Sequence, residues 1–174
     1  MDHINAADTI MGIGSTYYSQ RKYDEVIAQY ERALRIKEKV FRVDHINTAD
    51  TIMGIGLTYN SQGKYDLAIA QYERALRIKE KAFVVDHINA ANTINNLGIT
   101  YRHQGKYDEA IAQFERALKI KEKAFGMDHI YTAPIIMNIG LLFKVKGQTE
   151  LAKIKIVAKL PNICKALLAN MCEL

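Results

Sequence analysis

Four of the five histidines in the 174-residue chain directly follow an aspartate, so two metal-binding residue types stand side by side. These histidines are His3, His45, His87 and His129. Zinc needs several ligands close in space, and helical sites commonly supply a second one three or four residues along the chain. Each Asp-His pair stands alone in a step of 42 residues, without a strong ligand at either spacing. We therefore predict no metal and no other cofactor, and we expect each pair at a junction where its aspartate caps the following helix.

Residues that could act in catalysis lack the neighbours that catalysis requires. No serine, cysteine or lysine is accompanied by an evident base and orienting group. Gly12 and Gly14 suggest a phosphate-binding loop, but they lie inside a helical pattern that no strand precedes. The fifth histidine, His103, is more typical of a surface residue than of a base. The sequence therefore predicts that the protein is not an enzyme.

The two cysteines, Cys164 and Cys172, lie on one predicted helix near the end of the chain. The helical rise places them ~12 Å apart, which is too far for a disulfide. Residues 1–5 do not begin a basic and then apolar signal segment, and no apolar run approaches the ~20 residues that span a bilayer. These features lead us to expect an intracellular, cytoplasmic protein.

An internal repeat accounts for most of the sequence. The phrase Asp-His-Ile recurs at Asp2, Asp44, Asp86 and Asp128, in steps of 42 residues. The first two units differ at only 8 of 42 positions, whereas the fourth has diverged, chiefly after Gly147. A fixed period of this length is the signature of a repeat protein, in which each unit packs on the next.

Each unit contains two helical patterns separated by a turn. In the second unit, apolar and small residues first recur at the spacing of one helix face, at Ile52, Ile55, Gly56 and Tyr59. Gly63 then interrupts the pattern. A second helix follows with Ala68, Ile69, Tyr72, Ala75 and Leu76, and we expect it to continue through Phe83. Each unit is therefore predicted to be a helix, a tight turn and a longer helix.

These positions resemble the tetratricopeptide repeat consensus, in which a large residue, Leu-Gly and Tyr are followed by Ala and an aromatic residue. In the first unit they are Ile10, Ile13, Gly14, Tyr17, Val26 and Tyr30, and in the third Ile94, Leu97, Gly98, Tyr101, Ala110 and Phe114. The 42-residue period and the Asp-His junction resemble the kinesin light chain type of this repeat. The resemblance implies an all-α fold, a right-handed α-solenoid of four helix-turn-helix units.

The same resemblance implies a function and a site. First helices of successive units would line a concave groove that binds an extended peptide or a partner helix. Residues off the packing face would line it: Asp50, Met53, Leu57 and Asn60 in the second unit, Asn92, Asn95, Asn96, Ile99, Arg102 and His103 in the third, and Met137, Asn138, Leu141 and Lys144 in the fourth. Six of the 13 differences between the second and third units fall on this face, as selection for a ligand or neutral drift would each predict.

Charge and hydrogen-bonding groups vary along the predicted groove. Asn95, Asn96 and Asn138 suit a peptide backbone, because an amide both donates and accepts. Arg102 and Lys144 would attract an acidic partner, whereas Asp8 and Asp50 would make the other end acidic.

A nucleic-acid ligand is a weaker hypothesis, although related helical-pair repeats read single-stranded RNA. The net charge of +5 is modest, and the cations lie mainly on the second helices beside glutamates. We expect a protein or peptide partner, without nucleic acid or membrane.

The C-terminal region leaves two interpretations open. Residues 2–160 are predicted to hold the four units, and Pro161 separates them from a short apolar helix that ends the chain at Leu174. This helix would either cap the last unit or pair with a second chain. The second possibility makes a structural, self-associating module the alternative to a peptide-binding one.

Overall fold

The computed structural model describes residues 2–83, 87–126 and 129–147. The chain divides into two compact units, residues 1–85 and 86–174. In the ranges described, all regular secondary structure is α-helical. The predicted second helix of the fourth repeat and the predicted C-terminal helix lie outside the described residues.

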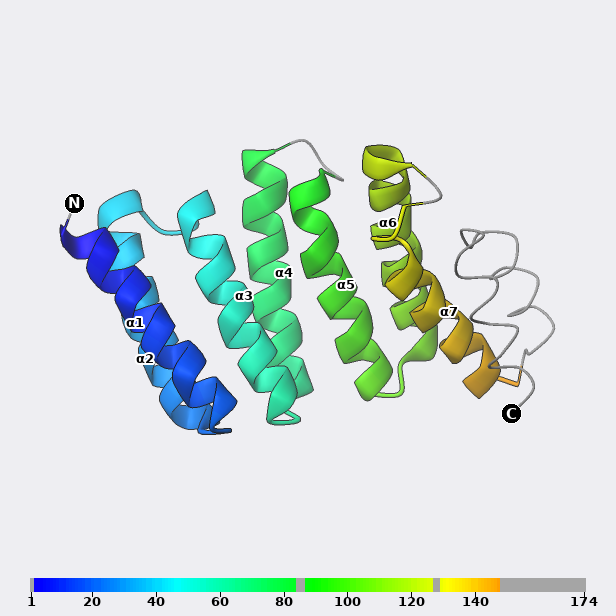
Figure 1. The fold of residues 1–174 in the computed structure, drawn as a ribbon, viewed down its shortest axis with the longest axis horizontal. Helices are drawn as coiled ribbons and strands as arrows, with labels where there is room; N and C mark the ends of the chain where they lie inside the picture. Colours follow the sequence, from blue (N-terminus) through cyan, green and yellow to red (C-terminus); the bar gives the residue numbers. More distant parts are fainter. Residues whose placement is uncertain (1, 84–86, 127–128, 148–174) are drawn as a thin grey trace. The chain divides into compact units, whose positions relative to one another are not determined.

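The first unit contains two complete repeats. The first pairs α1 (Asp2–Ser19) with α2 (Tyr23–Phe41), and the second pairs α3 (Ile46–Ser61) with α4 (Tyr65–Ala82). Each pair is antiparallel (Figure 1), and α2 also packs against α3, which joins the two repeats. α4 ends at Ala82, one residue short of the predicted end at Phe83, which is the C-cap residue.

The second unit repeats this arrangement over its described part. α5 (Ile88–His103) pairs with α6 (Tyr107–Phe125), and α6 packs against α7 (Ala133–Val145). α7 begins later than the equivalent α3 and α5 because its first turn contains Pro134. Proline is accepted there, since the first backbone N–H groups of a helix have no partner within it.

The core of the first unit lies where three helices meet. Leu34 of α2 packs against Ala49, Ile52 and Ile55 of α3, and Ile78 of α4 belongs to the same cluster. The positions predicted from the period of the helix face are therefore buried here, and their burial is the main source of stabilisation.

One predicted packing residue is exposed. Ile13 of α1 is 44% exposed, whereas its counterpart Ile55 is 3% exposed against the cluster that contains Leu34. Ile55 is covered because a second helix, α2, packs on α3 from the preceding repeat. In the described chain, α1 has no such preceding helix, so the prediction that Ile13 is buried is wrong.

Glycines at the helix contacts allow the paired helices to approach closely. A Cβ built on Gly98 of α5 would lie 2.7 Å from Cε1 of Phe114, and one on Gly56 of α3 would lie 2.9 Å from Cε1 of Tyr72. A third contact of this kind joins Gly14 to Tyr30 in the first repeat. Gly98, one of the consensus positions, therefore lies where the helices of its repeat pack most closely.

The junctions between repeats correct one prediction. The histidine, rather than the aspartate, caps the next helix: Nδ1 of His45 accepts from the backbone N–H of Asn47 (3.2 Å), and His87 does the same for Asn89 (3.2 Å). His129 accepts from the N–H of Tyr131 (3.3 Å) ahead of α7. His45 and His87 therefore satisfy N–H groups that a helix leaves unpaired at its start, whereas the contact of His129 lies in the turn before α7.

Asp44 has a different role from the predicted cap. It adopts a left-handed backbone conformation (φ 58°), and its carboxylate accepts from Nε of Arg74 at 2.9 Å. Arg74 also donates to Glu38 at 2.7 Å. Although burial alone would lower the pKa of Arg74, these two acidic partners raise it. Through Arg74, Asp44 thus links the junction to α4 by a salt bridge, and Glu38 links α2 to the same arginine.

Replacing His45 with alanine is expected to destabilise the first unit by ~1 kcal/mol, the usual cost of losing a helix N-cap. His45→Asn is the matched variant, since its side chain can also accept the Asn47 N–H. Urea denaturation followed by circular dichroism measures both. Equal losses in the two variants would show that capping by the side chain is not what stabilises this junction.

Candidate functional site

The predicted groove residues of the first unit lie on α3, beside a buried lysine that the prediction did not include. Nζ of Lys79 lies 3.0 Å from a carboxylate oxygen of Asp50 and 3.0 Å from the sulfur of Met53. The first repeat has the same arrangement, in which Nζ of Lys37 lies 3.0 Å from Asp8 and 3.3 Å from the sulfur of Met11. In both repeats of the first unit, a lysine of the second helix thus reaches the first-helix face of its own repeat.

These ion pairs change the predicted charge of the face. Asp8 and Asp50 each have a lysine partner, so their charges are compensated. The prediction of an acidic end formed by these two aspartates is therefore wrong. It failed because the second-helix lysines were assigned to the solvated surface beside glutamates.

The other α3 residues of the prediction differ in exposure. Leu57 is exposed, and Asn60 is half-buried. The adjacent Ser61 forms a 2.7 Å hydrogen bond with the hydroxyl of Tyr18 in α1. This bond joins the ends of α1 and α3, so the first helices of the unit lie side by side.

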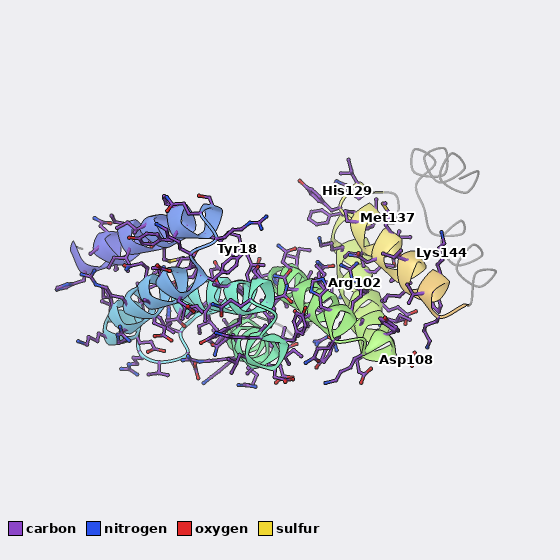
Figure 2. The ribbon with its side chains drawn as sticks, turned by 90° about the horizontal axis from the view of Figure 1, so that it is seen from below. Tyr18, Arg102, Asp108, His129, Met137 and Lys144 are labelled. Carbon is purple, nitrogen blue, oxygen red and sulfur yellow. The ribbon has the colours of Figure 1, made fainter. Side chains whose placement is uncertain are left out.

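The remaining predicted residues lie on α5 and α7 of the second unit, and we call this set the α5–α7 face. Its members are Asn92, Asn95, Asn96, Ile99, Arg102, His103, Met137, Asn138, Leu141 and Lys144. Nη1 of Arg102 donates to the side-chain oxygen of Asn138 at 3.1 Å, which joins α5 to α7. Figure 2 shows Arg102 on α5, and Met137 and Lys144 along α7.

The α5–α7 face presents exposed apolar and cationic groups. Met137, Leu141 and Lys144 of α7 are exposed, and Ile99 of α5 is half-buried. His103 lies next to Arg102, and its pKa is lowered by burial and then by the charge of Arg102. His103 therefore favours the neutral imidazole, and the positive charge of the face comes from Arg102 and Lys144.

The asparagines that α5 contributes to the α5–α7 face are available for new hydrogen bonds to different degrees. Asn92 is exposed, and Asn96 is half-buried. The side-chain oxygen of Asn95 is buried and has no hydrogen-bond partner among the described residues. An unpaired buried acceptor costs free energy, so Asn95 marks a position where an added donor would be stabilising. Asn138 differs from them, because Arg102 already occupies its oxygen.

Lys121 of α6 is the residue that the sequence analysis missed. It occupies the position of Lys37 and Lys79 in the third repeat, where Asn92 and Asn95 replace the aspartate and the methionine. Burial lowers the pKa of the Lys121 ammonium group. The signal was present in the sequence, because the lysine is kept while both of its contacts change between the second and third units.

Groups of three or more histidine, cysteine, aspartate or glutamate residues placed to hold a metal ion do not occur in the described ranges. Within the same ranges, no helix has the length and apolar character needed to cross a membrane.

The sequence matches the family model described as tetratricopeptide repeat over residues 4–81 and 86–154. The chain therefore belongs to the tetratricopeptide repeat family. No curated protein sequence matches it. Members of this family are generally non-catalytic scaffolds for protein–protein interaction.

Solved structures share the fold at low sequence identity. BtubC (BKLC) from P. vanneervenii has a TM-score of 0.79 at 22% identity, with 95% of this chain aligned to 64% of that one. A kinesin light chain-type protein of P. anserina, with nearly identical tetratricopeptide-like repeats, has a TM-score of 0.77 at 19% identity, with coverage of 91% and 76%. The apo form of RapI has a TM-score of 0.76 at 19% identity, with coverage of 89% and 42%. The chain thus spans less than two thirds of the length of BtubC.

Proposed function

We propose that the protein binds a peptide segment of a partner protein on the α5–α7 face. The observation that carries the proposal is the composition of this face. It combines exposed apolar side chains, Met137 and Leu141, with an unpaired buried acceptor on Asn95. Peptide recognition needs both kinds of group, because apolar contacts supply affinity and fixed polar groups set the register of the backbone.

The positive charge of the face specifies the ligand further. Arg102 and Lys144 lie on neighbouring helices, and the pKa of His103 is lowered, so it adds little charge at neutral pH. A peptide with acidic residues would be steered toward these cations. Under this proposal the protein is a non-catalytic interaction module, and the cytoplasm is the compartment that we propose for it.

Selection of displayed peptides on the folded protein tests the proposal. One sequence motif is expected to be enriched, and replacing Asn95 and Asn96 together with alanine should weaken its binding about tenfold or more, since each lost backbone contact costs ~1 kcal/mol. Asn89→Ala is the matched control, because Asn89 is an exposed asparagine in the first turn of α5. Isothermal titration calorimetry of a selected peptide gives the ratio of the dissociation constants of the variant and the wild type.

Asn138 is tested separately from the α5 asparagines. Because Arg102 donates to Asn138, Asn138→Ala removes an amide and also releases the guanidinium group. A motif that binds the Asn95→Ala, Asn96→Ala variant as well as it binds the wild type would count against the α5–α7 face. Absence of any enriched motif would count against peptide binding itself.

A structural, self-associating role is the second candidate, and the exposure of Ile13 favours it. This residue is 44% exposed at a position where Ile55 is buried by a helix of the preceding repeat. Burying such a side chain is favourable, so a further helix could pack on α1. Light scattering after gel filtration decides between the candidates, since a monomer at tens of micromolar would exclude self-association at that concentration.

A further inference from the structure

Exposed apolar side chains gather at the junctions between repeats. Twelve large hydrophobic side chains are exposed among the described residues, and half of them lie at or beside a junction: Val40, Val43, Phe83, Phe125, Ile130 and Tyr131. Val43 is 66% exposed and Ile130 is 74% exposed, so packing inside the units does not account for their apolar character. Clusters of exposed apolar groups commonly mark a surface that binds a partner.

The first unit has three of these side chains, Val40, Val43 and Phe83, at one end, which we call its junction end. Figure 1 shows α2 and α4 both ending on this side of the unit, together with the turn from α2 into α3. Arg74 of α4 donates to Glu38 of α2 at 2.7 Å, so the last turns of the two helices lie near each other. The three apolar side chains therefore belong to one end of the unit, although two helices and a turn supply them.

The junction end also presents cations. Lys39, Arg42 and Lys81 are exposed, and among the described residues no salt bridge joins them to an acid. Two neighbouring acids, Glu38 and Asp44, already pair with an arginine of α4. Positive charge and exposed apolar surface are thus combined in the same last turns.

The opposite end of the unit, where the turns inside the repeats lie, has balanced charge. In residues 15–28 and 57–70 the charged groups are three cations and three acids: Arg21, Lys22, Lys64, Asp24, Glu25 and Asp66. Leu67 supplies an exposed apolar side chain there. This end therefore offers cations and an apolar group of the same kinds in another place, which makes it a control for the junction end.

The second unit has the same combination at its own junction. Phe125 and Tyr131 are 44% and 55% exposed, and their ring centroids lie 5.2 Å apart. Ile130 is adjacent in the chain, and Lys123 is exposed in the last turn of α6 without a salt bridge in the ranges described. Tyr131 stands where the other three repeats have asparagine. Tyrosine is enriched at membrane–water interfaces, because its ring is apolar and its hydroxyl is polar.

We propose that the junction end of the first unit and the equivalent junction of the second unit bind the surface of an anionic phospholipid membrane. The cations contact the lipid headgroups, and the apolar side chains enter the boundary between headgroups and acyl chains. Cations alone would also fit a nucleic acid, but a phosphate backbone in water gives Val43 and Ile130 no apolar environment. The membrane accounts for both kinds of group.

This proposal is independent of peptide binding, because the α5–α7 face consists of other residues. It departs from the expectation that no membrane is a partner. That expectation rested on the lack of a spanning segment, and attachment to a membrane surface does not require one.

Flotation of the full chain with lipid vesicles tests the proposal. We expect binding to phosphatidylcholine vesicles that contain roughly a third phosphatidylserine, little binding to phosphatidylcholine alone, and loss of binding as salt is added. The junction variant removes four exposed cations: Lys39→Gln, Arg42→Gln, Lys81→Gln and Lys123→Gln. It should bind the anionic vesicles about a hundredfold more weakly, since each cation near such a surface contributes about fivefold.

A control variant removes the same charge from the turns inside the repeats. Its four changes are Arg21→Gln, Lys22→Gln, Lys64→Gln and Lys106→Gln. It should bind the anionic vesicles within about threefold of the wild type, because charges away from the membrane are screened by salt.

Tryptophan fluorescence tests the apolar part of the contact, because the chain contains no tryptophan of its own. Val43→Trp and Ile130→Trp each place one at a junction, and Leu67→Trp places one at the opposite end of the first unit. All three positions are exposed, so the larger side chain does not disturb the core. With anionic vesicles, we expect emission to move to shorter wavelength at the two junction positions and to stay unchanged in Leu67→Trp.

Several outcomes would overturn the proposal. The wild type might not float with the anionic vesicles, or the junction and control variants might lose binding equally. Flotation without a change in Val43→Trp and Ile130→Trp emission would mean that charge alone attracts the protein and that the junctions do not enter the membrane. Binding of a single-stranded oligonucleotide without binding of vesicles would assign the cations to a nucleic acid instead.

Discussion

Replacing Phe114 with alanine is expected to destabilise the second unit by ~3–5 kcal/mol, the usual cost of removing a buried aromatic side chain. Phe114 is fully buried, and its ring lies on the backbone of α5 at Gly98. The glycine offers no side chain that could move into the space, so alanine would leave a cavity. A loss of this size is a large part of the stability of an ordinary domain. Urea denaturation followed by circular dichroism should show a much lower midpoint for this unit.

Phe125 supplies the matched control in the same helix. It is 44% exposed at the end of α6, where its ring stacks on His129 with centroids 5.0 Å apart. Phe125→Ala should cost only ~1 kcal/mol, because little buried area is lost together with two exposed ring contacts, to His129 and Tyr131. Similar losses at the two positions would mean that the α5–α6 contact is not the main source of stability in this unit.

The register of the repeats was predictable because helix packing repeats a simple rule. Ile52, Ile55 and Gly56 are spaced by the period of one helix face, and the structure buries all three. The same rule located Gly98 against Phe114. These positions depend on contacts within one repeat or with its neighbour. Because neighbouring repeats are nearly identical, the pattern of one repeat predicts the same contacts in the others.

Features that depend on side-chain reach or on a missing neighbour were not predictable in this way. Ile13 matches the pattern, yet it is exposed because its burial requires a preceding second helix. At the junction, the choice between His45 and Asp44 as the cap depends on backbone conformation, and Asp44 instead accepts from Arg74. Sequence spacing alone does not distinguish two adjacent acceptors.

The charges of the candidate site were mispredicted for a related reason. Lys79 stands in a run of alternating charges, which predicts a solvated surface, but its long side chain buries its stem and places the ammonium group beside Asp50. Comparison between repeats would have revealed the contact, because Asp50 and Met53 change together in the third repeat.

Replacing Gly98 with alanine should cost ~1–3 kcal/mol, whereas Gly12→Ala should stabilise the protein by up to ~1 kcal/mol. Both glycines lie within first helices, so alanine improves helix propensity equally at each. The difference comes from packing: a Cβ at Gly98 would lie 2.7 Å from the ring of Phe114, while one at Gly12 would meet nothing within 4 Å. Thermal unfolding measures both variants: the melting temperature should fall for Gly98→Ala and rise for Gly12→Ala.

A double variant identifies the cause of the loss at Gly98. In Gly98→Ala, Phe114→Leu the smaller side chain leaves room for the new Cβ, so the two changes together should cost less than the sum of their separate effects. The added Cβ would otherwise lie 2.7 Å and 2.8 Å from two ring carbons of Phe114, which is fully buried and has no space to retreat into. Strict additivity would place the cost in the backbone of α5 rather than in the α5–α6 contact. A stabilising Gly98→Ala would show that the two helices can separate without loss, and the close approach at this glycine would then not be needed for the fold.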